Sequence, residues 1–174
     1  SNDGYADHSF IELYNPTGSN INLNGWSVQY RSSSSGDQAG GWAVLKLTGV
    51  IEANGYYLIR CGAVAKPAGS YQVPQGNQEW NMMLHNKGLS VALLNSDTPL
   101  TDAFAGDITA KGVTLPAEFV DLAAVGGNDG TANQVPPVYE GAFASIQSKK
   151  KAIRRIGFAD TDNNKADFEE VNYS

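Results

Sequence analysis

Cysteine is nearly absent from this chain of 174 residues, in which Cys61 is the single example. One cysteine excludes an internal disulfide, and it also excludes a zinc site built from four cysteines. Cys61 ends an apolar stretch that covers residues 56–61. We therefore expect a buried and unreactive thiol rather than a nucleophile.

Histidine is almost as rare, with His8 and His85 as the two candidates for a catalytic base. A catalytic triad needs a nucleophile, a base and an orienting group in contact. Each histidine stands alone in its neighbourhood, and the chain has no serine elbow, paired-histidine metal helix or phosphate-binding loop. The sequence therefore predicts that the protein is not an enzyme. A hydrolase fragment would need a pocket in which a histidine meets an acid.

Long apolar runs are missing too, and none approaches the roughly 18–20 residues that a membrane span requires. The sequence shows no leader resembling a signal peptide, so we expect any export signal to have been removed or to lie elsewhere. With 41% hydrophobic and 17% charged residues, the composition is that of an ordinary globular protein. We predict that residues 1–174 form one domain with its own core.

Helical periodicity is scarce, whereas short strand patterns separated by turn signals recur along the chain. Trp26, Val28 and Tyr30 alternate with Ser27 and Gln29, which is typical of a strand with one buried face. The expected strands cover residues 10–14, 26–31, 42–47, 56–61, 89–93, 119–125 and, as the last, 152–156. This set of short strands predicts an all-β sandwich or barrel.

Three segments, in a fixed order along the chain, carry motifs of a known family. Residues 10–15 read F-I-E-L-Y-N and are followed by L-N-G-W at residues 23–26. Residues 51–59 read I-E-A-N-G-Y-Y-L-I, and residues 160–168 read D-T-D-N-N-K-A-D-F. Together they resemble the lamin tail domain family, and the last motif is similar to the ending of its bacterial members.

The resemblance implies an immunoglobulin-like β-sandwich with long irregular loops. It also implies a domain without catalytic residues of its own. Bacterial members resemble accessory modules of exported proteins, often next to nucleases, phosphoesterases or other hydrolases. The expected location is therefore extracellular or at the bacterial cell surface.

The start of the chain departs from the family pattern. Bacterial relatives begin with a hydrophobic strand ahead of a glycine-rich loop, and here Ser1-Asn2-Asp3-Gly4 resembles that loop itself. Without the strand, one sheet edge would be unpaired. Such an edge could add a strand from another chain, so self-association is a further hypothesis.

Oxygen-bearing side chains near the C-terminus form the best candidate for a metal site: Asp160, Asp162, Asn164 and Asp167. Carboxylates at alternate positions can wrap a calcium ion. An EF-hand would need glycine and glutamate where this chain has Lys165 and Val171, however. The alternative, which we favour, is a turn in which the aspartates accept backbone N–H bonds.

Basic residues gather in one place on a chain whose formal net charge is -6: Lys149, Lys150, Lys151, Arg154 and Arg155. This cluster could bind a polyanion such as nucleic acid or a phosphate polymer. No aromatic residues interleave with it to stack on bases, so nucleic acid is a weak candidate. The alternative is a solvated strand whose charges prevent edge-to-edge aggregation.

Glu12, Asn15 and Trp26 lie in the first motif, and we assign them structural roles. Glu12 is expected to be partly buried within its strand, where it would need a polar or cationic partner to stabilise the fold. Trp26 and Trp42 are expected in the core. A ring that stacks on sugars is the alternative for the aromatic residues.

The sequence as a whole predicts a non-catalytic attachment, scaffolding or targeting module of a bacterial exported or surface protein. It would bind a protein or a cell-envelope component through its loops or a sheet edge. The alternative is a module that binds polyanions or carbohydrate and delivers them to a neighbouring hydrolase domain. No cofactor is expected other than a possible calcium ion.

Overall fold

The computed structural model describes residues 5–33, 41–64, 69–127, 135–144, 148 and 150–173. Its regular structure is nearly all β. The strands are β1 (His8–Tyr14), β2 (Ile21–Asn22), β3 (Ser27–Ser32), β4 (Ala43–Lys46), β5 (Val50–Ile51), β6 (Tyr56–Ala63), β7 (Gln78–Glu79), β8 (Leu89–Leu94), β9 (Gly106–Asp107), β10 (Phe119–Val125), β11 (Val138–Tyr139), β12 (Lys151–Arg155) and β13 (Phe168–Asn172), and the short helix is α1 (Asn164–Asp167).

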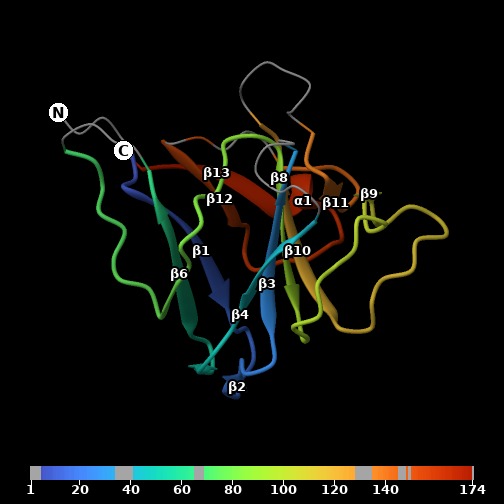
Figure 1. Ribbon diagram of the computed structural model, residues 1–174, viewed down its shortest axis with the longest axis horizontal. Coiled ribbons are helices and arrows are strands. Elements are labelled where there is room, and N and C mark those ends of the chain that lie inside the picture. Colours follow the sequence, from blue (N-terminus) through green and yellow to red (C-terminus); the bar gives the residue numbers. More distant parts are fainter. Residues whose placement is uncertain are drawn as a thin grey trace.

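Two sheets form the body of the protein (Figure 1). The larger has the strand order β10-β8-β3-β4 and is antiparallel throughout. The smaller has the order β1-β6-β7, in which β1 and β6 are antiparallel and β6 and β7 are parallel. This arrangement confirms the predicted immunoglobulin-like β-sandwich with long irregular loops.

Apolar side chains from both sheets meet in the main core. Val28 of β3 and Ile59 of β6 have no exposed surface, and Ile11 of β1 packs against the same cluster. Successive side chains of a strand point to opposite faces, which explains why Ile59 and Cys61 are buried while Tyr56 is exposed. Each fully buried aliphatic side chain contributes about 1.5–3 kcal/mol to folding.

A second core lies on the other side of the four-stranded sheet. Trp42 and Leu122 of this region pack with Leu100 and Phe104, which belong to the long connection between β8 and β10. That connection therefore lies over the outer face of the sheet, which we call the covered face.

The covered face corrects one prediction. The alternation in β3 suggested that Ser27 and Gln29 face solvent, yet both are fully buried. Gln29 donates to the carbonyl of Thr98 at 2.9 Å and accepts from the amide of Leu100 at 2.8 Å. The polar side chains are buried because the overlying loop offers them backbone partners.

The C-terminal segment corrects another prediction, since residues 152–156 are not the last strand. Strand β12 forms an antiparallel hairpin with β13, and α1 lies between them. Ring contacts place this hairpin beside β1: Phe158 stacks on Tyr14, and Tyr173 contacts Phe10. On its other side, Arg155 of the hairpin pairs with Asp121 of β10.

Strand β1 stands at the edge of its sheet, and among the described residues its ladder partner is β6. The contacts with the C-terminal hairpin run along this strand without a ladder. Self-association through the edge stays a prediction.

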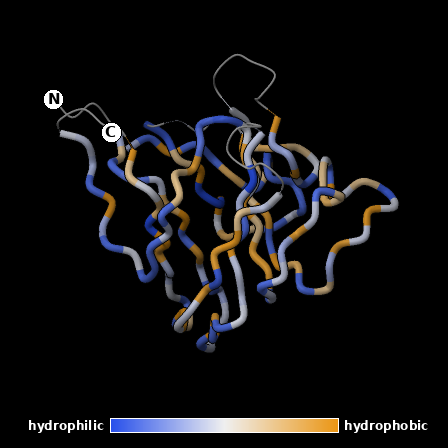
Figure 2. Tube along the Cα trace, in the orientation of Figure 1, coloured by the Kyte–Doolittle hydropathy of each residue, from blue (hydrophilic) through white to orange (hydrophobic). Residues whose placement is uncertain are grey.

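Hydrophobic and hydrophilic residues alternate along the strands instead of forming long uniform runs (Figure 2). Within the described residues, none of the helical structure has the length and apolar character needed to cross a membrane.

Candidate functional site

The connection between β12 and β13, which we call the C-terminal loop, holds two buried polar side chains among the predicted metal ligands, Asn164 and Asp167. Asp167 is almost fully buried and accepts from the amide of Thr161 at 3.0 Å, from its hydroxyl at 2.7 Å and from the amide of Asn163 at 3.3 Å. Burial alone would raise the pKa of Asp167, but these hydrogen bonds together lower it. The carboxylate thus fixes the loop in its folded shape.

Asn164 connects this loop to the larger sheet. Its amide group donates to the carbonyl of Leu122 and to the Glu140 carboxylate, both at 2.8 Å, and its oxygen accepts from the amide of Glu140 at 2.9 Å. Asn164 has no exposed surface. Its polar atoms are therefore engaged in holding α1 against β10.

Three carboxylates converge next to this loop. Asp121 from β10, Glu140 after β11 and Asp160 each offer an oxygen within 4.8 Å of the others. Burial, with the charges of Asp121 and Asp160, raises the pKa of Glu140 to about 8. Burial likewise raises the pKa of Asp121, although Arg155 opposes the shift.

A cation is already present beside these carboxylates. Arg155 pairs with Asp121, and its guanidinium lies 3.4 Å from Asp160 and 3.7 Å from Asp167. The same guanidinium stacks over the ring of Phe168 at 4.6 Å. Arg155 thus joins the hairpin to β10 by charge and by packing.

Of the four predicted calcium ligands, only Asp160 belongs to this carboxylate group. Asp162 is exposed, and its amide donates to Asp160 Oδ1 at 3.4 Å, as in the alternative turn interpretation. Asp121 and Glu140 were missed because they come from distant segments of the chain.

Calcium binding stays a prediction, and titration calorimetry with calcium on the protein and on Asp160→Ala would test it. The absence of heat with both proteins would contradict it.

The predicted basic cluster is largely neutralised by neighbouring acids. Lys151 pairs with Glu170 at 2.6 Å, and Arg154 pairs with Glu169 at 2.7 Å. The β12–β13 register places Glu169 directly opposite Arg154, whereas Glu170, opposite Ile153, is a diagonal neighbour of Lys151. Lys150 is exposed and lies over the ring of Tyr5, and Lys149 lies outside the described residues.

The environment of His8 differs from the prediction. The sequence predicts that His8 stands alone, and this prediction is wrong, because its Nδ1 lies 3.0 Å from the Asp7 carboxylate. The nearest hydroxyl in sequence, Ser9, accepts from the amide of Leu84 and donates to the carbonyl of Gly62. Cys61 is buried as predicted, and burial, with the charge of Glu79, raises the pKa of its thiol to about 12, which disfavours the reactive thiolate.

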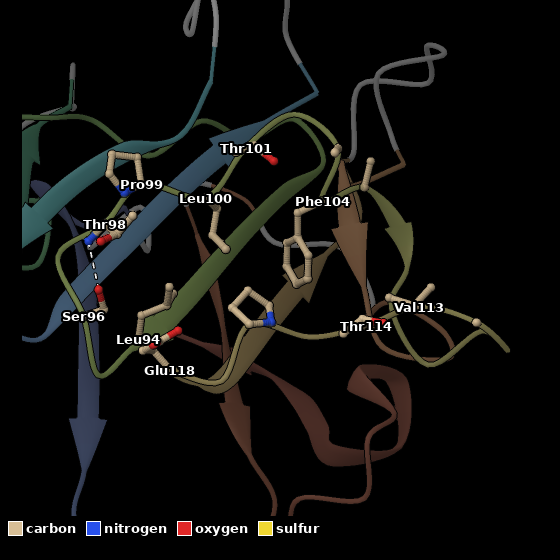
Figure 3. A pocket seen from close by; sticks show the side chains of 14 residues that line it. Leu94, Ser96, Thr98, Pro99, Leu100, Thr101, Phe104, Val113, Thr114 and Glu118 are labelled. Atoms are coloured by element: carbon tan, nitrogen blue, oxygen red, sulfur yellow. Dashed lines mark hydrogen bonds between the residues drawn. The ribbon is translucent and has the colours of Figure 1, made fainter.

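An open groove of about 510 Å³ lies beside the long loops of the covered face (Figure 3). Leu94, Leu100 and Phe104 line it together with hydroxyl side chains such as Thr98. Among the described residues that line it, Glu118 is the one with a titratable side chain. The described lining therefore lacks the paired titratable groups by which an acid–base site is usually recognised.

Three aromatic rings, of which two are exposed and Tyr14 is half-buried, gather on the outer face of the three-stranded sheet. Tyr14 and Tyr56 are cross-strand neighbours whose ring centroids lie 4.8 Å apart, and Phe158 stacks on Tyr14 at 4.0 Å. Tyr56 is 55% exposed and Phe158 is 51% exposed. We call the surface formed by these three rings with Glu12 and Leu58 the open face.

The structural residues of the first motif differ in their environments. Glu12 is exposed on the open face, so the prediction of partial burial is wrong. Asn15 is buried and donates to the carbonyls of Ser19 and Glu52 while it accepts from Thr17. Trp26 is half-buried and packs against the main core.

Comparison with known proteins assigns the family. The sequence model of the lamin tail domain matches residues 1–106, which is more than half of the chain. The chain belongs to the lamin tail domain family. No curated protein matches it.

The matched segment of this lamin tail domain holds the whole three-stranded sheet and strands β3, β4 and β8 of the larger one. Tyr14 and Tyr56 of the open face lie within it, whereas Phe158 and the residues around Arg155 lie after it. Lamin tail domains are immunoglobulin-like modules and are typically non-catalytic.

Proposed function

We propose that this lamin tail domain is a non-catalytic binding module within a bacterial exported or surface protein. The domain binds a cell-envelope component and thereby attaches the protein to the envelope. The open face is the observation that carries the proposal. It presents two rings that are each more than half exposed, on a sheet whose other side is packed into the main core. Aromatic side chains are enriched where proteins bind partners, because they bury much area with little loss of conformational freedom.

The arrangement of the titratable groups supports binding over catalysis. The buried carboxylate Asp167 and the half-buried Arg155 serve to hold the C-terminal loop and hairpin in place. The ion pairs of Lys151 and Arg154 reduce the attraction of this hairpin for polyanions. An aromatic surface is then the strongest recognition feature that the described residues offer.

Co-sedimentation with washed bacterial cell-envelope fragments tests the proposal. The unaltered protein is expected to sediment with the fragments, and Tyr56→Ser is expected to stay in the supernatant. Tyr71→Ser is the matched control, because Tyr71 is another exposed tyrosine, 42% accessible, outside the open face. No sedimentation, or equal sedimentation of Tyr56→Ser and the unaltered protein, would contradict the proposal.

A further inference from the structure

The turn that carries Phe158 has a backbone conformation that does not suit phenylalanine. Gly157 and Phe158 have φ values of 58° and 60°, and the amide of Ala159 donates to the carbonyl of Ile156 at 3.1 Å. Positive φ at both central residues with this hydrogen bond is the signature of a type I′ turn, which favours asparagine or glycine. A bulky side chain is unfavourable there.

The strained conformation holds the ring of Phe158 against the open face. Its plane lies 23° from that of Tyr14, at a centroid distance of 4.0 Å. About half of the Phe158 side chain still faces water, so burial in the fold offsets the strain only in part. Such strained residues cluster at functional sites, where the geometry serves binding.

A carboxylate without an ion-pair or hydrogen-bond partner in the described part of the chain stands next to the rings. Glu12 precedes Tyr14 by two residues in β1, so both side chains point to the open face. Its cross-strand neighbour is the apolar Leu58. The open face thus combines stacked rings with a hydrogen-bond acceptor.

We propose that the open face binds a neutral carbohydrate chain, with a sugar ring packed on Phe158 and Tyr56 and its hydroxyl groups donating to Glu12. This inference rests on the proposed function and names the chemistry of the envelope component. The C–H side of a sugar ring packs on an aromatic face, and its hydroxyls satisfy the carboxylate. An apolar protein surface would instead leave Glu12 buried and unpaired. The net charge of -6 disfavours anionic glycans.

Affinity electrophoresis in native gels tests the inference. The gels contain hydroxyethyl cellulose, galactomannan or soluble starch as neutral probes, and polygalacturonate as the anionic probe. We expect at least one neutral polymer to retard the protein, and Phe158→Asn and Tyr56→Ser each to weaken the association constant at least ten-fold. Tyr71→Ser should migrate like the unaltered protein.

Thermal unfolding of the same variants separates binding from folding. Asparagine suits the positive φ of residue 158, so Phe158→Asn should lose binding while its melting temperature stays equal or rises. If Phe158→Asn proves unstable, Tyr56→Ser decides the matter, because its ring is the more exposed. Retardation that survives in a folded Tyr56→Ser would overturn the inference.

The remaining outcomes distinguish this inference from the proposed function. No retardation by any neutral polymer overturns the carbohydrate ligand, yet envelope binding that depends on Tyr56 would leave the proposed function intact. If protease treatment of the envelope fragments abolishes that binding, the partner is a protein. Dimers in analytical ultracentrifugation that disappear in Tyr56→Ser would show that the open face joins two copies of this chain, and would also overturn the inference.

Discussion

The two outer faces of the sandwich differ in whether other parts of the chain pack over them. On the covered face, the connection between β8 and β10 packs Leu100 and Phe104 onto the four-stranded sheet and buries Gln29 completely. On the open face, no comparable connection crosses the described part of the three-stranded sheet, and Tyr56 and Phe158 remain more than half exposed. The first face is used for stability, and the second is available to a partner.

This difference shows that a polar or apolar position in a strand acquires its role from what packs on it. Gln29 is polar yet fully buried, because loop backbone groups bond to its amide. Tyr56 is aromatic yet exposed, because nothing described lies over it. Substitutions on the covered face should therefore affect folding, and those on the open face should affect binding.

The largest effect is expected at Phe104, which is 9% exposed and contacts both Trp42 and Phe119 on the covered face. Phe104→Ala should lower the free energy of unfolding by about 4 kcal/mol, because it removes buried apolar surface and leaves a cavity. Tyr56→Ser, its counterpart on the open face, should lower it by no more than about 1 kcal/mol. Urea unfolding of both variants measures this contrast, and equal losses would break the comparison.

The pH dependence of stability is the next effect in size. Burial first, and then nearby negative charges, raises the pKa of Glu140 from 4.5 to about 8, so the folded protein holds a proton that the unfolded chain releases. The stabilisation that protonated Glu140 contributes is fully present below pH 4.5 and is lost as the pH rises through 8. The expected loss between pH 5 and pH 8 is about 3 kcal/mol.

Glu140→Gln provides the control for this pH effect. Glutamine keeps an oxygen that can accept from Asn164, but it cannot ionise. Urea unfolding of this variant should show a flatter pH profile and a higher stability than the unaltered protein at pH 8. An identical slope for the two proteins would show that Glu140 does not cause the dependence.

A smaller contrast is expected between Gln29 and Glu12, the polar residues of the two faces. Gln29→Ala leaves the buried amide of Leu100 without its partner and removes the partner of the Thr98 carbonyl, which should lower stability by about 2 kcal/mol. Glu12→Gln changes an exposed side chain and should alter stability by less than about 0.5 kcal/mol. Chemical denaturation compares the pair, and a large loss for Glu12→Gln would restore its predicted role in stabilising the fold.

Much of the fold could be predicted because it is encoded locally. The alternation at Tyr57, Ile59 and Cys61 identifies β6, and its side chains face the core as expected. Asn54, in the turn before this strand, adopts a positive φ of 53°, which asparagine tolerates better than most residues. Residues 119–125 form a strand with the predicted bounds.

The remaining features depend on contacts between segments far apart in sequence. Strand β13 was missed because its residues carry two glutamates and gain their order by pairing with β12. The carboxylate group around Asp121 and Glu140 was missed for the same reason. The sequence around Phe158 hardly indicates its strained turn, since a glycine before an aromatic residue does not by itself predict one.

Hydroxyl-radical footprinting of the protein, free and bound to cell-envelope fragments, tests the central claim most directly. Tyr56 and Phe158 report on the open face, while Val113 and Leu115 are exposed reporters from the connection between β8 and β10, at 41% and 42%. We expect binding to protect Tyr56 and Phe158 from oxidation and to leave Val113 and Leu115 as reactive as before. Protection confined to Val113 and Leu115 would contradict the assignment of the open face as the binding surface.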